Sequence, residues 1–183
     1  SYEHIKPLVD YGHIHFGENK VQEAQAKWRE VKKKRPDLKL HLIGKLQSNK
    51  AKEAVSLFDY IHSVDNQKLA SLLAKHESNI NKKIKYFIQV NIGQESQKSG
   101  IEIKFLDDFF YYCTKELNLN IIGLMAIPPN DGKENIYFKD LMELNKLQGL
   151  KELSMGMSSD FQEALKYETT FVRIGSSIFG NRF

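Results

Sequence analysis

Short apolar runs alternate with amphipathic segments along most of this chain. Seven such runs are expected to form strands, at residues 13–17, 38–44, 60–64, 86–92, 121–127, 153–157 and 171–175. Their mostly apolar composition is typical of parallel strands that are covered on both faces. Apolar residues repeat at helical spacing in the segments between them, so the chain is expected to alternate strand and helix.

Two of the intervening segments carry a clear apolar stripe. One stripe consists of Val21, Ala24, Trp28 and Val31, and the other of Leu69, Leu72, Leu73 and His76. Helical stripes of this kind are expected to pack against a sheet. Strands joined by right-handed helical crossovers build either an open doubly wound sheet or a closed (β/α)8 barrel, and the number of strands favours the barrel.

The first residues predict a helix where a barrel would begin with a strand. Residues 1–9 are expected to be helical with Ser1 as the N-cap, so the preceding strand is expected upstream of this chain. Adding that strand gives about eight, the number that closes a barrel. We therefore expect an α/β fold, a (β/α)8 TIM-type barrel without its first strand, as a single domain over residues 1–183.

The composition is ordinary for one compact domain, with 41% hydrophobic and 27% charged residues. The longest apolar stretch, residues 121–127, is far shorter than the roughly 20 residues that span a bilayer. No basic and apolar leader opens the chain, so we expect a cytoplasmic protein that does not enter a membrane. Cys113 is the single cysteine, which excludes an intrachain disulfide, and its expected role is packing.

The net charge of +4 and the basic run at residues 32–35 raise the question of nucleic acid binding. The run lies just before Pro36, at the expected end of a helix, where cations complement the helix dipole. Aromatic side chains that could stack on bases do not interleave with it. We therefore expect a solvated helix end and no nucleic acid partner.

Small residues and hydroxyls follow the last two expected strands. Ser158 comes after one strand, and Gly175 and Ser176 come after the next. Ser159 and Gln162 have the spacing of a capping box, which would begin a helix and leave Ser158 free to face a ligand. Barrels form phosphate sites after their last two strands, from free backbone N–H groups, so we expect the ligand to carry a phosphate.

Arg173 lies inside the last apolar strand, immediately before this predicted phosphate site. Alternation along the strand places it on the same face as Phe171 and Gly175. A buried arginine needs a partner, which is either a ligand in the barrel or a carboxylate in a structural salt bridge.

Other polar residues have weaker signals. Asn19 follows the first strand, where it either donates to a ligand or caps the next helix. Lys50 lies in a similar place after the second strand and is expected to be solvated. His13 and His15 share a strand face, a spacing that suits zinc, but no third ligand converges, so no metal site is expected.

At these residues the chain resembles the pyridoxal-phosphate homeostasis proteins, whose barrel is similar to the N-terminal domain of bacterial alanine racemase. The resemblance covers nearly the whole chain. It is carried by residues 15–19 (HFGEN), 41–44 (HLIG), 46–50 (LQSNK), 58–65, 89–93 and 123–128, and by two C-terminal motifs that end at residues 179–182.

The resemblance implies a role for each candidate residue. Ser158, Gly175 and Ser176 would hold the phosphate of pyridoxal 5′-phosphate (PLP), Arg173 would face the pyridine nitrogen, and Asn19 would lie beside the ring. An arginine at that nitrogen keeps it unprotonated and weakens the ring as an electron sink, which suits binding better than carbanion chemistry.

The same resemblance implies a monomeric protein for PLP homeostasis that has no catalytic residues, performs no turnover and passes the cofactor to PLP-dependent apoenzymes. The lysine that would form the Schiff base belongs on the strand upstream of Ser1, and we assign that role to none of Lys6, Lys45 or Lys50. Two alternatives stay open: the protein is longer at its N-terminus, or this chain has lost the capture of the aldehyde. The alternative is a PLP-dependent amino-acid racemase, but racemisation needs a base on each ligand face, one of which comes from a second domain or a partner subunit.

Overall fold

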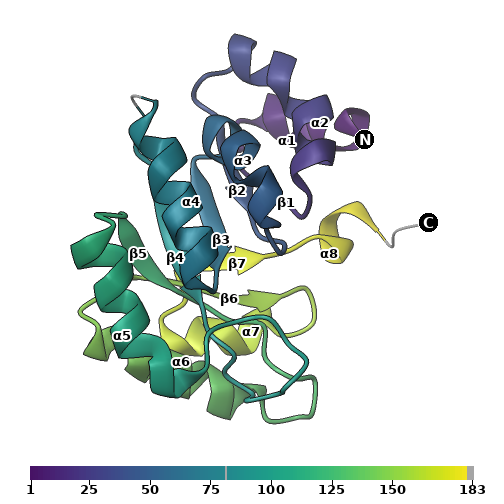
Figure 1. Ribbon diagram of the computed structural model, residues 1–183. Helices are drawn as coiled ribbons and strands as arrows, with labels where there is room; N and C mark the ends of the chain where they lie inside the picture. Colours follow the sequence, from purple (N-terminus) through teal and green to yellow (C-terminus); the bar gives the residue numbers. More distant parts are fainter. Residues whose placement is uncertain (81, 181–183) are drawn as a thin grey trace.

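The structure is a computed structural model that describes residues 1–80 and 82–180. Seven parallel strands form one sheet in sequence order (Figure 1). They are β1 (His15–Glu18), β2 (Lys39–Leu42), β3 (Tyr60–Val64), β4 (Lys85–Gln89), β5 (Ile121–Met125), β6 (Glu152–Met157) and β7 (Phe171–Arg173). All seven predicted strands are confirmed, with ends that differ by a few residues. Residues 181 and 182 of the last family motif lie outside the described residues.

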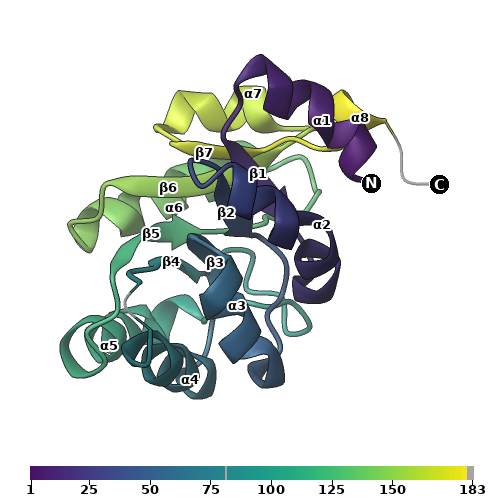
Figure 2. The same ribbon diagram turned by 90° about the horizontal axis from the view of Figure 1, so that it is seen from above.

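Helices cover the outside of this sheet. They are α1 (Tyr2–Tyr11), α2 (Val21–Lys34), α3 (Ala51–Leu57), α4 (Gln67–Ser78), α5 (Leu106–Tyr111), α6 (Glu134–Leu147), α7 (Phe161–Ala164) and α8 (Ser176–Phe179). The short 3₁₀ helices η1 (Ser48–Lys50), η2 (Ile103–Phe105) and η4 (Leu165–Tyr167) and the π-helix η3 (Tyr112–Glu116) accompany them. Seen from above, the strands gather in the middle, and α2, α3, α4 and α5 lie around them (Figure 2). The expected α/β barrel architecture is confirmed.

The sheet curves until its first and last strands approach each other. The ring of Phe171 on β7 lies 6.3 Å from the ring of His15 on β1 and 5.7 Å from that of Tyr60 on β3, measured between centroids. Phe87 on β4 joins the same group, 5.6 Å from Phe171. Side chains from four strands meet in this way only if they share an enclosed face, so the sheet forms a nearly closed barrel. The strand expected upstream of Ser1 stays a prediction.

The apolar stripes seen in the sequence pack between strands and helices. On α2, Val21, Ala24 and Trp28 are buried, and on α4, Leu69 and Leu73 are buried. The indole Nε1 of Trp28 donates to Glu18 Oε1 at 2.6 Å. The buried polar atom of this large side chain is therefore satisfied by the last residue of β1.

The basic run differs from its prediction at one residue. Lys32 is mostly buried, and its Nζ lies 2.5 Å from Asp59 Oδ2, whereas Lys33 remains exposed beside Glu30. Asp59 directly precedes β3, so the barrel provides Lys32 with an anionic partner that only the tertiary structure brings near.

Two further features bear on the sequence-based expectations. Cys113 is buried, and burial raises the pKa of its thiol to about 12, which agrees with a packing role.

Among the residues that the structure describes, no helix has the length and apolar character needed to cross a bilayer.

Candidate functional site

The carboxyl ends of β6 and β7 bring three of the predicted site residues together. Ser158 follows β6, Gly175 is the N-cap of α8, and Ser176 is the first residue of that helix. The hydroxyl oxygen of Ser158 accepts hydrogen bonds from the backbone N–H of Gly175 at 3.2 Å and of Ser177 at 3.5 Å. Main-chain donors therefore converge on one oxygen at the barrel rim.

The capping box predicted at Ser159 and Gln162 is not formed. The helix α7 begins at Phe161, its N-cap is Asp160, and no side-chain cap bond is made. Instead Asp160 Oδ1 accepts from the backbone N–H of Met157 at 2.6 Å. The short Asp carboxylate closes the turn between β6 and α7, so the turn does not need a serine cap, and Ser158 bonds to the β7–α8 loop.

Arg173 extends into the barrel from β7. Its Nη1 donates to Ser154 Oγ and its Nη2 to the carbonyl oxygen of Ala126, both at 2.8 Å. These partners are neutral, and among the described residues no carboxylate forms the salt bridge that the sequence left open. Burial lowers the pKa of the guanidinium to about 10, so it stays charged near neutral pH. A cation thus lies in the barrel two residues before Gly175.

Asn19 lies directly after β1, at the carboxyl end of that strand. The helix that follows has Lys20 at its N-cap without a side-chain cap bond, so Asn19 does not cap it. The backbone of Asn19 is packed against Gly44, where an added Cβ would lie 2.2 Å from the Asn19 carbonyl oxygen. The loops after β1 and β2 are therefore in close contact. Lys50, on η1, is partly exposed, with its Nζ 3.9 Å from Glu53.

The sequence analysis missed a line of histidines inside the barrel. His15 Nδ1 lies 2.9 Å from His41 Nε2, and His41 Nδ1 lies 2.9 Å from His62 Nε2. His62 Nδ1 in turn lies 2.9 Å from Ser154 Oγ, the oxygen that Arg173 also contacts. Strand alternation could have placed His41 and His62 on inward faces, but it could not have shown that they meet.

Among the described residues, no group of three or more His, Cys, Asp and Glu side chains could hold a metal ion. His13, the other half of the predicted zinc spacing, instead makes an edge contact with the ring of Phe16.

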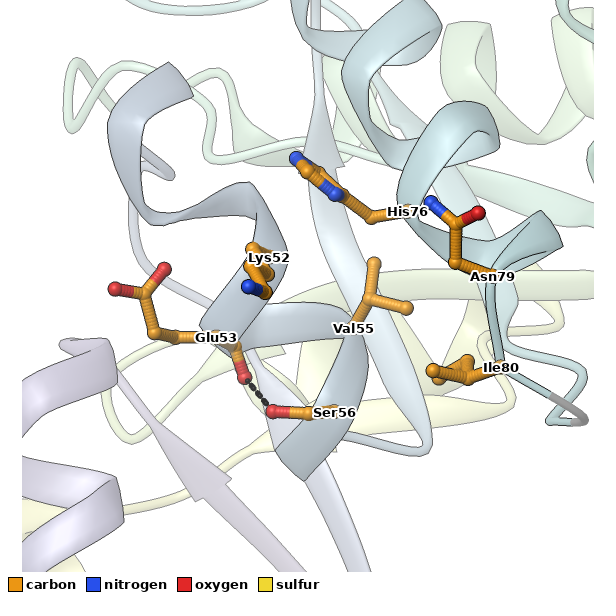
Figure 3. A pocket seen from close by; sticks show the side chains of 7 residues that line it. All are labelled: Lys52, Glu53, Val55, Ser56, His76, Asn79 and Ile80. Carbon is orange, nitrogen blue, oxygen red and sulfur yellow. Dashed lines mark hydrogen bonds between the residues drawn. The ribbon is translucent and has the colours of Figure 1, made fainter.

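A separate hollow of about 330 Å³ lies between α3 and α4 (Figure 3). It is lined by Lys52, Glu53, Val55, Ser56, His76, Asn79 and Ile80. Ser56 Oγ donates to the backbone oxygen of Glu53 at 2.8 Å, so that hydroxyl is engaged within its own helix. The hollow belongs to the helical layer, and none of the predicted site residues lines it.

A nearly closed parallel barrel covered by helices, with backbone N–H groups converging after its last two strands, places this chain in the class of (β/α)8-type barrels. The family model described as "Alanine racemase, N-terminal domain" matches residues 2–182. Relatives named pyridoxal phosphate homeostasis protein include those of Aquifex aeolicus (strain VF5), 39% identical over 98% of this chain and 82% of the relative, and of Escherichia coli (strain K12), 35% identical over 97% and 80%. The chain belongs to the alanine racemase N-terminal domain family and, within it, to the pyridoxal phosphate homeostasis proteins.

Solved structures show the same relationship. PipY from Synechococcus elongatus PCC7942, solved with PLP bound, is 35% identical with a TM-score of 0.89, over 98% of this chain and 87% of PipY. Alanine racemase from Corynebacterium glutamicum is 16% identical with a TM-score of 0.69, over 99% of this chain and 53% of the racemase. The racemase shares the fold alone, whereas the homeostasis relatives confirm the resemblance predicted from the sequence.

Proposed function

We propose that this protein binds PLP at the carboxyl end of its barrel and serves PLP homeostasis, without catalytic turnover of its own. The observation that carries the proposal is the position of Arg173, whose guanidinium is held inside the barrel two residues before Gly175. The relatives' name and the PLP bound to PipY support the same ligand.

Ser158, Gly175 and Ser176 would hold the phosphate. The N–H groups of Gly175 and Ser177 already point at one hydroxyl oxygen, which is the arrangement a phosphate oxygen also satisfies. A Cβ built on Gly175 would have no heavy atom within 4 Å, so space for a ligand lies beside this backbone. The donor set therefore fits the phosphate group.

Arg173 would face the pyridine nitrogen, with Asn19 beside the ring. PLP supplies an aldehyde and an electron-accepting pyridine ring, and protonation of the ring nitrogen strengthens that electron sink. A guanidinium has only donors and stays protonated, so Arg173 would give a hydrogen bond to the nitrogen and no proton. This chemistry supports a protein that holds PLP for recipient apoenzymes better than it supports a racemase.

The test is a PLP titration of three proteins, followed by absorbance or fluorescence. Arg173→Ala should bind PLP at least about tenfold more weakly than wild type, because a hydrogen bond to a charged group is worth about 1.5–3 kcal/mol. Lys50→Ala is the matched control, since it also removes a rim cation, and its affinity should stay within about twofold of wild type.

Equal affinities for the two variants would remove Arg173 from the site. A racemisation assay with PLP and alanine addresses turnover, since exchange of enantiomers above the rate with free PLP would contradict a pure binding role.

A further inference from the structure

A continuous hydrogen-bonded chain crosses the barrel interior and ends at Arg173. It runs from His15 on β1 through His41 on β2 and His62 on β3 to Ser154 on β6, each contact 2.9 Å long, and Arg173 on β7 bonds to Ser154 at 2.8 Å. Five strands therefore contribute to one line of polar side chains inside the barrel. The residues proposed above to bind PLP do not include the three histidines, so the function of these side chains remains to be assigned.

Arg173 fixes the direction of the hydrogen bonds in this chain. A guanidinium only donates, so Ser154 Oγ must accept from it. The Ser154 hydroxyl proton then needs an acceptor, and the other bonded partner of this fully buried oxygen is His62 Nδ1. Leaving the hydroxyl proton unpaired inside the barrel would cost about 1–3 kcal/mol. Ser154 therefore donates to His62, whose Nδ1 must be unprotonated.

The imidazoles are neutral, so each carries one proton. His41 and His62 are buried, and burial lowers the pKa of His41 to about 3 and that of His62 well below 6.5. Burial also lowers the pKa of His15. A positive charge on one of the rings is opposed by the neighbouring imidazole (His15 acts on His41, and His41 on His62) and by His13, Lys39, Lys85 and Arg173, and it is favoured by Asp59.

Because a neutral imidazole carries only one proton, the direction of the hydrogen bond at one nitrogen determines the direction at the other. With Nδ1 bare, His62 carries its proton on Nε2 and donates it to His41 Nδ1. His41 is then protonated on Nε2 and donates to His15 Nδ1, which leaves His15 protonated on Nε2 as well. All three histidines thus have the same tautomer, and each is determined by Arg173.

Ring stacking holds these imidazoles in place. His41 stacks on Tyr60 at 4.0 Å between centroids with an interplanar angle of 11°, and His62 stacks on Phe87 at 4.2 Å and 18°. A ring flipped by 180° would place the carbons Cδ2 and Cε1 where Nδ1 and Nε2 now lie and would break both hydrogen bonds of that imidazole. The chain therefore behaves as a rigid support behind Ser154.

We propose that Ser154, His62, His41 and His15 form a positioning network that orients the Arg173 guanidinium toward the ring nitrogen of bound PLP. The inference rests on the proposed function, because it assigns the network to the same site. The network does not conduct protons to the ligand, since it ends at Arg173, which retains its own proton near neutral pH. Its members are positioning residues that act through Arg173.

The first test is the tautomeric state of the wild-type protein, measured by long-range ¹H–¹⁵N NMR on ¹⁵N-histidine-labelled protein near neutral pH. The expected pattern for His15, His41 and His62 is a protonated Nε2 and a bare Nδ1, with and without PLP. An Nδ1-protonated or charged imidazole at His41 or His62 would overturn the proposal.

The second test uses His62→Phe, which keeps a ring to stack on Phe87 but removes both nitrogens. PLP should bind about tenfold more weakly, and the Arg173 guanidinium N–H signals should exchange faster, because Ser154 loses its acceptor. Tyr60→Phe is the matched control, since it removes a hydroxyl from the same interior and leaves the chain intact, and it should change neither quantity.

If His62→Phe does not fold, Ser154→Ala provides the same measurement from the other side of the contact. Unchanged PLP affinity and unchanged Arg173 exchange in a folded variant would refute the positioning role. Failure of wild-type protein to bind PLP would instead refute the proposed function, while the tautomer pattern would still test the network.

Discussion

His41 is a buried histidine whose two ring nitrogens are both bonded to other imidazoles. Such a ring is stable in the barrel only as the neutral form, because a proton added there would meet burial and the neighbouring His15. The pKa of His41 is about 3, compared with 6.5 for an unperturbed imidazole. Between about pH 3 and 6.5, the imidazole of His41 is therefore protonated in the unfolded chain and neutral in the folded chain.

This difference predicts that acid begins to destabilise the protein above the pH range in which carboxylates titrate. The contribution of His41 to stability is fully present above about pH 6.5. As the pH decreases toward 3, the loss of this contribution should lower the free energy of unfolding by up to about 1.4 kcal/mol per pH unit. His15 and His62, whose pKa values are also lowered by burial, add to the same slope. Urea unfolding at several pH values measures it.

His41→Phe should be less stable at neutral pH but show a shallower slope, because it removes one titrating ring. Tyr60→Phe changes the ring stacked on His41 and leaves the imidazole in place, so it should keep the wild-type slope. Parallel slopes for His41→Phe and wild type would contradict the prediction.

At the scale of elements, two glycines that follow strands at the barrel rim have contrasting surroundings. Gly44 follows β2 and is pressed against the Asn19 backbone, with 2.2 Å between an added Cβ and the carbonyl oxygen. Gly175 has a φ of −124° and nothing within 4 Å of an added Cβ. The first glycine is required by contact between two loops, and the second leaves space that the protein itself does not fill.

Alanine at each position should separate these roles. Gly44→Ala should lower the free energy of unfolding by about 2–4 kcal/mol, because backbone must move to make room for the methyl group. Gly175→Ala should change stability by less than about 0.5 kcal/mol but weaken PLP binding at least about tenfold, since the methyl group enters the proposed phosphate space. Thermal unfolding and PLP titration of both variants check this. A stable Gly175→Ala protein with wild-type affinity would place the phosphate elsewhere.

At the scale of the whole molecule, the basic run at residues 32–35 does not form a surface patch of unpaired positive charge. Lys32 pairs with Asp59, Lys33 with Glu30 and Arg35 with Asp37, at 2.5, 2.7 and 2.7 Å. Carboxylates therefore compensate most of this run, which weakens its attraction for an external anion. The site proposed at the rim of β6 and β7, where two N–H groups converge, is therefore expected to bind an anion in preference to this run.

Crystals grown in high sulfate should therefore hold an anion between Ser158 and Gly175. The measurement is the electron density of the bound ion, together with a phosphate-dependent rise in melting temperature. An empty rim with sulfate bound only at residues 32–35 would contradict both the site and the argument from charge.

The sequence by itself determined the elements and the order of the barrel. Apolar periodicity located all seven strands and the buried stripe of α2, because burial on one or both faces depends on local spacing. It also placed Ser158 and Gly175 at a shared edge, since parallel strands end on the same side. It failed at the Ser159 capping box, because Asp160 and Ser159 compete locally and spacing alone does not decide between them.

The tertiary structure alone decided the contacts across the barrel. His41 and His62 are 21 residues apart, and His62 and Ser154 are 92 apart, so their meeting depends on strand register and barrel curvature. Alternation predicts which side chains face inward but carries no information on which inward residues of different strands lie level. For the same reason the sequence could not show which group bonds to Arg173. An arginine in an apolar strand can bond to a carboxylate or to a hydroxyl such as that of Ser154, and only the tertiary structure places Ser154 beside it.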